Sequence, residues 1–227
     1  MGLYALIEVE GPSRTETRPL RPLLPMEMAA AVRRAVSTAF ERRGAFAVPV
    51  GDLELVALTN GLGPEEHLEA LAEIDYAVNG RVRIAATCKD APLKAVLVAH
   101  QKLRSSEGRL MVEECEPAPY VVAHASFWSD ELLDYSPLER ALVLNEIADE
   151  VIGAVIKSNG IPWRLSDGVL LAVLPERFEQ VVEALARYAL VGVGRSTKSL
   201  EALELSARAL SRLARGLAKE NPLIISS

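Results

Sequence analysis

Short apolar runs alternate along the first half of the chain with longer segments of helical periodicity, which predicts a mixture of strands and helices. The proline-rich residues 11–25 separate the first strand from the first helix and exclude a helix there. The predicted order is strand, helix, two strands, helix, strand and one further helix. The strands are predicted at residues 3–9, 45–50, 53–59 and 82–87, and the helices at residues 26–43, 64–79 and 91–104.

The second half repeats this order. Residues 110–115, at the join of the halves, add a predicted edge strand. The strands of the second half are predicted at residues 120–125, 161–165, 169–174 and 189–193, and the helices at residues 137–159, 177–188 and 197–217.

A local repeat supports the same division. Residues 50–58 are echoed by residues 165–173, and each copy places an aspartate, Asp52 or Asp167, in a tight turn between two apolar runs. Such turns join antiparallel strands. We therefore expect an α+β protein of two tandem ferredoxin-like (βαββαβ) units, residues 1–113 and 114–227, with antiparallel sheets and an extra helix after each.

Composition excludes several classes of protein. The net charge of −6 argues against a nucleic-acid polymer as partner. The chain has no apolar run long enough for a membrane helix and no signal peptide, so we expect a cytoplasmic protein with no membrane partner. Arginine outnumbers lysine and glutamine is nearly absent, as in proteins of thermophiles. Cys88 and Cys115 match no zinc pattern, and we expect both to be reduced.

The first strand of a βαββαβ unit lies beside the third, because its crossovers are right-handed. Glu8 ends the first predicted strand and Asp52 precedes the third, so these carboxylates should lie close enough to share a divalent cation. The alternative is a structural role for these aspartates. Aspartate favours tight turns for local reasons, and Asp52 and Asp167 each stand in such a turn.

Four short motifs resemble archaeal GTP cyclohydrolase III, a family of two palm-like ferredoxin repeats related to nucleotidyl cyclases. Residues 7–12, Ile-Glu-Val-Glu-Gly-Pro, are similar to the family's Ile-Asp-Asn-Tyr-Gly-Pro. Residues 55–61 are similar to a family run that also ends in Thr-Asn-Gly. In the second half, residues 122–124 resemble the start of the family's first strand, and residues 165–168 stand where it has Gly-Gly-Asp-Asn.

The resemblance implies an enzyme that binds GTP, opens the imidazole ring of its base with water and removes diphosphate, leaving a formamidopyrimidine nucleotide. It implies Mg²⁺, which would neutralise the phosphates and activate the water. We also expect a homo-oligomer. No catalytic side chain is assigned. The implied metal ligands are Glu8, Asp52, Asp130 and Asp167, and the implied nucleotide-binding residues are Gly11, Pro12, Arg18 and Arg21.

Departures from the family motifs separate the two halves. Glu8 keeps the charge of the family aspartate on the first strand, whereas Ser126 takes that position in the second half. We therefore expect catalysis mainly in the first half, with Asp167→Ala costing less activity than Asp52→Ala. The alternative is a catalytically degenerate relative that binds a nucleotide or serves a structural role.

The three histidines are scattered along the chain. His67, His100 and His124 have no acidic or thiol partner at ligand spacing, so we expect surface or core histidines.

Overall fold

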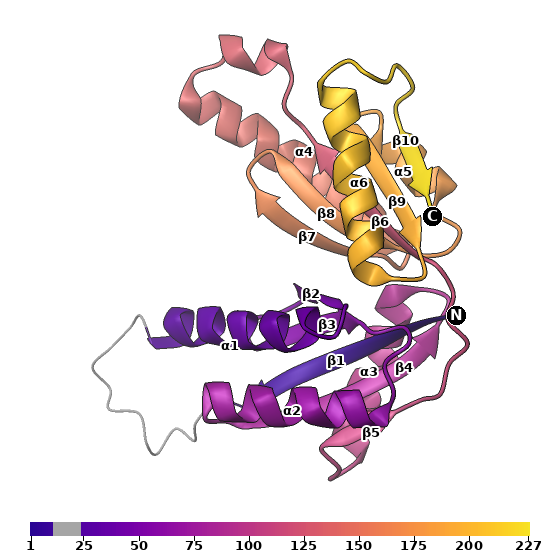
Figure 1. Cartoon of the computed structure of the whole chain (residues 1–227). Coiled ribbons are helices and arrows are strands. Elements are labelled where there is room, and N and C mark those ends of the chain that lie inside the picture. The colour runs from indigo at the N-terminus through magenta and orange to yellow at the C-terminus, as the bar shows by residue number, and fades with distance from the viewer. Residues whose placement is uncertain (11–23) are drawn as a thin grey trace. The chain divides into compact units, whose positions relative to one another are not determined.

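The computed structural model describes residues 1–10 and 24–227, apart from the side chains of residues 24–25 and 130–131. It divides into two compact units, and Figure 1 draws the first from indigo to magenta and the second largely from salmon to yellow. The first unit holds Met1–Lys89 and Lys94–Ala118, and the second holds Asp90–Leu93 and Pro119–Ser227.

The first sheet has the strand order β2-β3-β1-β4-β5. Its first four strands pair antiparallel, and β5 joins the edge parallel to β4, which confirms the predicted edge strand. The elements of this part of the chain are β1 (Gly2–Glu10), α1 (Leu24–Glu41), β2 (Phe46–Pro49), β3 (Glu54–Leu58), α2 (Pro64–Val78), β4 (Arg81–Lys89), α3 (Pro92–Ser105) and β5 (Leu110–Val112).

The second sheet repeats this arrangement as β7-β8-β6-β9-β10, again with a parallel fifth strand at the edge. The prediction of two ferredoxin-like units, each with an extra helix, is confirmed. The strand β10 was not predicted. The elements are β6 (Tyr120–Ser126), η1 (Asp130–Asp134), α4 (Pro137–Lys157), β7 (Ile161–Ser166), β8 (Val169–Leu174), α5 (Glu179–Leu185), β9 (Leu190–Ser196), α6 (Ser199–Ala214) and β10 (Leu223–Ser226).

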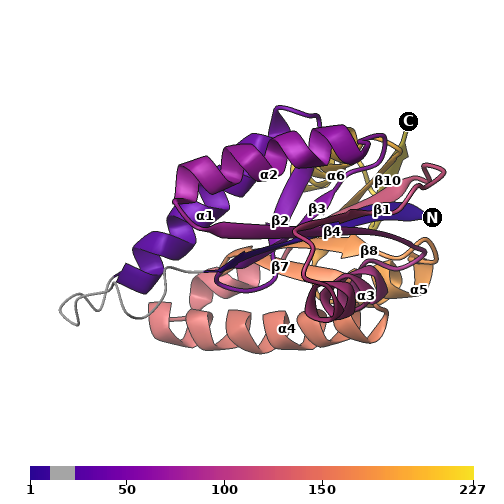
Figure 2. The same cartoon turned by 90° about the horizontal axis from the view of Figure 1, so that it is seen from below.

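Strand alternation gives the first sheet two different faces. The odd-numbered residues of β1, such as Ile7 and Val9, pack into a core with α1 and α2. The even-numbered residues, among them Glu8, therefore point to the opposite face, where Figure 2 shows α3. A hydrogen bond ties α3 to β4: the hydroxyl of Thr87 donates to the carbonyl of Ala95 at 3.0 Å.

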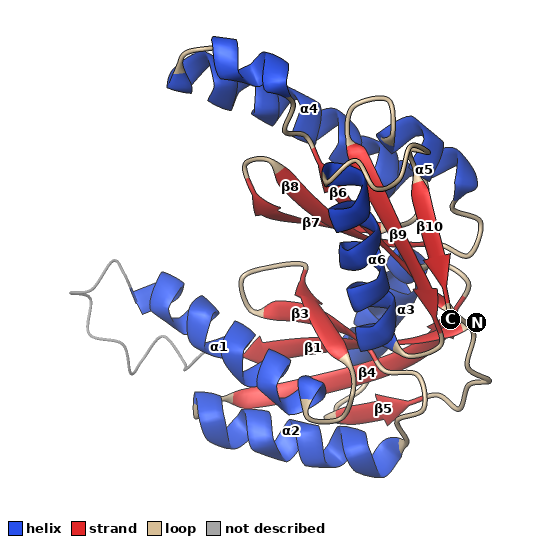
Figure 3. Cartoon of the chain, turned by 45° about the horizontal axis from the view of Figure 1, so that its top comes forward, coloured by secondary structure: helices blue, strands red, loops and turns tan. Residues whose placement is uncertain are grey.

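The second sheet is also covered on both faces. Its core forms between β6 and the helices α4 and α5, whereas α6 packs across β9 and β6 (Figure 3). Two glycines of β9 allow this close packing. A Cβ atom on Gly192 would lie 2.2 Å from the backbone nitrogen of Leu210, and one on Gly194 would lie 2.0 Å from the carbonyl oxygen of Ala202. Any larger residue would push the helix away from the sheet.

Cys88 and Cys115 form a disulfide, with their Cα atoms 5.9 Å apart. The expectation that both are reduced is wrong. The parallel strand β5 runs beside β4 and returns the chain to the end of β4, so residues 27 positions apart meet there. Among the described residues, none of the helices is both long and apolar enough to cross a membrane.

Candidate metal centre

Two glutamates face each other on neighbouring strands of the first unit. Glu8 of β1 is the direct register partner of Glu54 of β3. The backbone amides of Val50 and Gly51 both donate to the carbonyl of Glu54, at 3.0 and 3.2 Å. These hydrogen bonds close the turn between β2 and β3 and fix the position of Glu54 at the start of β3. The adjacent strands therefore place two carboxylates side by side on the face away from the α1–α2 core.

His100 of α3 completes this cluster. Its Nε2 lies 3.7 Å from Oε1 of Glu8, and the side chains of Glu8 and His100 are 18% and 36% exposed. One ligand atom from each of Glu8, Glu54 and His100 lies within 4.8 Å of the other two. Three elements distant in sequence thus contribute one candidate ligand each.

The electrostatics of the cluster favour a positive charge within it. Burial raises the pKa of Glu8, His100 opposes that shift, and Glu54 adds to it. The neighbouring Arg83 and Arg104 act to lower the pKa of Glu8 but do not offset its burial. Two like charges directly opposed across a strand pair destabilise each other, and a bound cation removes that repulsion.

The donor set fits a divalent cation. Carboxylate oxygens are the ligands that Mg²⁺ takes in proteins, usually with several waters retained. Carboxylate with imidazole is in addition a ligand set for first-row transition metals. Water and phosphate oxygens would complete the coordination of such a cation.

The sequence model of the GTP cyclohydrolase III family matches residues 10–128, more than half of the 227 residues. The chain belongs to the GTP cyclohydrolase III family. It is 27% identical over 191 residues to GTP cyclohydrolase III of Aeropyrum pernix, an alignment that covers 81% of this chain and 79% of that protein. The matched span includes Glu54 and His100 but begins two residues after Glu8.

Two solved structures are distantly similar to the chain. A bacterial light-regulated adenylyl cyclase is 10% identical with a TM-score of 0.34, over 96% of this chain and 83% of that one. A putative chlorite dismutase is 13% identical with a TM-score of 0.27, over 90% of this chain and all of that one. Similarities at this level carry no information about function.

Asp52, the other ligand candidate of the first unit, lies on the surface. The side chain of Asp52 is 92% exposed and pairs with Arg33 at 4.0 Å. Asp52 is not part of the metal-ligand group found among the described residues. Its ligand role stays a prediction. The nucleotide-binding candidates of the proline-rich segment lie outside the described residues: Gly11, Pro12, Arg18 and Arg21.

The second unit has no carboxylate pair at the corresponding place. Ser126 of β6 is the register partner of Val169 of β8, and Val169 stands two residues after Asp167, as Glu54 stands two after Asp52. Counting from the hairpins, Ser126 and Val169 correspond to Glu8 and Glu54.

Of the two second-unit ligand candidates, the structure describes the side chain of Asp167 alone, and it lies on the surface. Asp167 is 81% exposed and pairs with Arg164 at 3.2 Å. The side chain of Asp130 lies outside the described part of the structure. Trp128 takes up the space beside the hairpin, since a Cβ atom on Gly168 would lie 1.9 Å from its Nε1.

Sequence reasoning missed Glu54 and His100. His67 is buried and His124 is half-buried, but the expectation that His100 has no acidic partner is wrong. The ligand pattern is invisible along the chain because α3 returns to the sheet 46 residues after Glu54. Strand register would have identified Glu54, since it pairs directly with Glu8.

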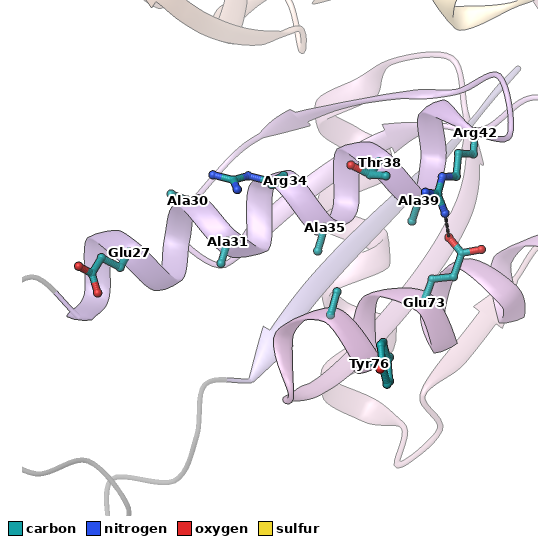
Figure 4. A pocket seen from close by; sticks show the side chains of 11 residues that line it. Glu27, Ala30, Ala31, Arg34, Ala35, Thr38, Ala39, Arg42, Glu73 and Tyr76 are labelled. Carbon is teal, nitrogen blue, oxygen red and sulfur yellow. Dashed lines mark ion pairs between the residues drawn. The ribbon is translucent and has the colours of Figure 1, made fainter.

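A groove between α1 and α2 is a second concave feature of this unit (Figure 4). Alanines of α1 line its floor, and Arg42 pairs with Glu73 across it at 3.9 Å. The groove lies on the helical layer, whereas Glu8 points to the other face of the sheet. It is therefore separate from the candidate metal centre.

Proposed function

We propose that the protein acts as a GTP cyclohydrolase of the third type, opening the imidazole ring of GTP in a reaction that depends on a divalent cation. Membership of the GTP cyclohydrolase III family supports the reaction class. One observation supports placing this reaction in the first unit. Glu8 and Glu54 form a pair of half-buried carboxylates on its neighbouring strands β1 and β3.

The proposed chemistry is hydrolytic and needs no redox partner. One water adds to the imidazole carbon of guanine, the bond from that carbon to the ribosylated nitrogen breaks, and the carbon remains on the other nitrogen as a formyl group. The freed ring nitrogen takes up a proton. Removal of diphosphate is a separate hydrolysis that consumes a second water.

The protein residues have distinct roles in this proposal. Glu8 and Glu54 would hold Mg²⁺ or a related cation, together with oxygens of the triphosphate and water. When bound, such a cation neutralises phosphate charge and activates water. The pairing of β1 with β3 fixes both carboxylates before substrate arrives, so little ordering is required on binding.

Purified protein incubated with GTP and Mg²⁺ tests the proposal. Ring opening should abolish the purine absorbance band, and phosphate analysis should detect released diphosphate. Omission of the cation, or addition of EDTA, should stop both changes. Glu65→Gln, in the exposed first turn of α2, is a matched control that should retain full activity.

The same assay identifies the alternative. Tight GTP binding with an unchanged purine spectrum would contradict catalysis and favour a nucleotide-binding relative. Neither binding nor turnover would favour a structural role. Size-exclusion chromatography with light scattering tests the expected homo-oligomer independently.

A further inference from the structure

We infer that Glu8, Glu54 and His100 form a three-ligand site that prefers a first-row transition cation, such as Mn²⁺, Co²⁺ or Zn²⁺, to Mg²⁺. This inference names the class of cation that the site takes. It rests on the proposed function only in assuming that the site serves GTP hydrolysis. His100 is the residue that sets this preference.

Geometry supports a shared cation. Ligand atoms about 2.0–2.2 Å from one metal ion stand roughly 3–4.3 Å from each other, depending on the angle between them. The 3.7 Å between Nε2 of His100 and Oε1 of Glu8 falls in that range. The 4.8 Å limit for the whole group requires only a small side-chain adjustment, which half-buried glutamates can make.

The second unit provides an internal comparison. The same two paired positions hold Ser126 and Val169 there, so the fold does not require facing acids at this place. In the first unit the sequence places two acids together and adds an imidazole from another element. An ion pair between His100 and one glutamate alone is worth little at this exposure and leaves the repulsion between the acids largely in place.

The imidazole decides the type of cation. Mg²⁺ demands oxygen ligands and keeps its waters, so His100 adds little to its binding. Mn²⁺, Co²⁺ and Zn²⁺ accept imidazole nitrogen, and their affinity for a mixed nitrogen and oxygen site rises in that series from Mn²⁺ to Co²⁺. The ring of His100 is 36% exposed, so its nitrogen is accessible without unfolding of α3.

The test is direct titration of the full-length protein with Co²⁺, Zn²⁺ and Mg²⁺ in the absence of GTP. Co²⁺ binding is followed by its visible absorbance, and Zn²⁺ affinity by competition with a chromophoric chelator. We expect one Co²⁺ per chain at this site, a spectrum typical of mixed nitrogen and oxygen ligation, and Zn²⁺ bound at least about 100-fold more tightly than Mg²⁺.

Three variants and one control locate the site. His100→Gln should weaken Co²⁺ and Zn²⁺ binding by about 10- to 100-fold and shift the Co²⁺ bands, while changing Mg²⁺ affinity by less than about threefold. Glu8→Gln and Glu54→Gln should weaken binding of all three cations. Glu65→Gln should change nothing. Circular dichroism establishes that each variant is folded.

Two results would overturn the inference. The first is Co²⁺ and Zn²⁺ binding that all three variants leave unchanged. The second is binding that depends on Glu8 but gives the same Co²⁺ spectrum and affinity in His100→Gln. Failure of the proposed function is distinguishable, because GTP turnover is measured separately: a protein that binds Zn²⁺ through His100 but leaves GTP intact contradicts only the proposed function.

Discussion

The two units use one architecture and differ where the first carries its charged cluster. In each unit the central strand, β1 or β6, pairs with the second hairpin strand, β3 or β8, in the same register. The hairpin aspartate stands two residues before the first residue of that hairpin strand, whose partner lies near the end of the central strand. That pair is Glu8 with Glu54 in the first unit and Ser126 with Val169 in the second. The fold is therefore independent of these charges.

The second unit fills the corresponding region with packing. Trp128 lies against Gly168 of the hairpin, and the guanidinium of Arg140 stands 5.9 Å from the centre of the Trp128 ring. A guanidinium stacked on an aromatic ring can stabilise the surface, but neither group is a ligand for a metal ion. The first unit thus carries a candidate site, whereas the second places an aromatic ring beside its hairpin.

The strongest test of this comparison removes the polar group from each of the two corresponding positions, a carboxylate in the first unit and a hydroxyl in the second. Glu8→Gln should lower cation-dependent GTP turnover by at least about 100-fold, which corresponds to about 2.7 kcal/mol of transition-state stabilisation. Ser126→Ala should change it by less than about twofold. Steady-state rates at saturating cation measure both, and comparable losses in the two variants would show that the site is not confined to the first unit.

The outlines of both units were predictable because apolar periodicity and turn residues are local signals. The strand β10 was missed because its residues follow a helix with no hairpin to mark them, and it pairs with β9 in parallel. The disulfide and the approach of His100 to Glu8 were missed for the same physical reason. Both depend on segments that meet only after the chain has folded.

A half-buried histidine, His124, gives the second unit a pH dependence that the first lacks at the corresponding position. Burial lowers the pKa of His124 from 6.5 to about 4, and its Nδ1 lies 2.8 Å from Oγ of Ser206. Counting from the hairpins, the corresponding residue of the first unit is the buried Leu6.

This shift predicts a loss of stability in acid. Because the folded pKa is below the unfolded value, the unfolded state binds the proton first as pH falls below 6.5. The second unit should therefore lose about 3 kcal/mol between pH 6.5 and pH 4 from this group. Both tryptophans, Trp128 and Trp163, belong to the second unit, so urea unfolding followed by fluorescence reports on it.

His124→Leu is the matched variant for this prediction, because it installs the residue of the first unit. The hydroxyl of Ser206 still donates to the carbonyl of Leu203 at 2.7 Å. The variant should remove most of the slope of stability against pH that His124 contributes. An unchanged slope would show that other groups control the acid response of the second unit.

A smaller effect, of changing sign, is expected when the first unit is given the residue of the second. Glu54→Val should raise the free energy of unfolding of the cation-free protein by about 0.5–1 kcal/mol, because it removes the repulsion between facing acids. Saturating cation should then stabilise the wild type but not the variant. Thermal unfolding followed by circular dichroism, with EDTA and with Mn²⁺, checks both signs, and a variant less stable than wild type in EDTA would contradict the repulsion.

The smallest effects on stability are expected at the two hairpin aspartates, where the comparison is finest. The side chains of Asp52 and Asp167 are 92% and 81% exposed, and among the described residues each pairs with one arginine. Replacing either by alanine should change stability by less than about 0.5 kcal/mol.

Asp52 stands two residues before Glu54, where its charge adds to the attraction for a cation. Asp52→Ala should therefore lower GTP turnover by about 3- to 10-fold, mainly through weaker apparent cation affinity. Asp167→Ala should stay within about twofold, because Ser126 and Val169 offer no carboxylate at the corresponding pair. Turnover measured against cation concentration separates the two, and equal, complete loss in both variants would overturn the asymmetry between the units.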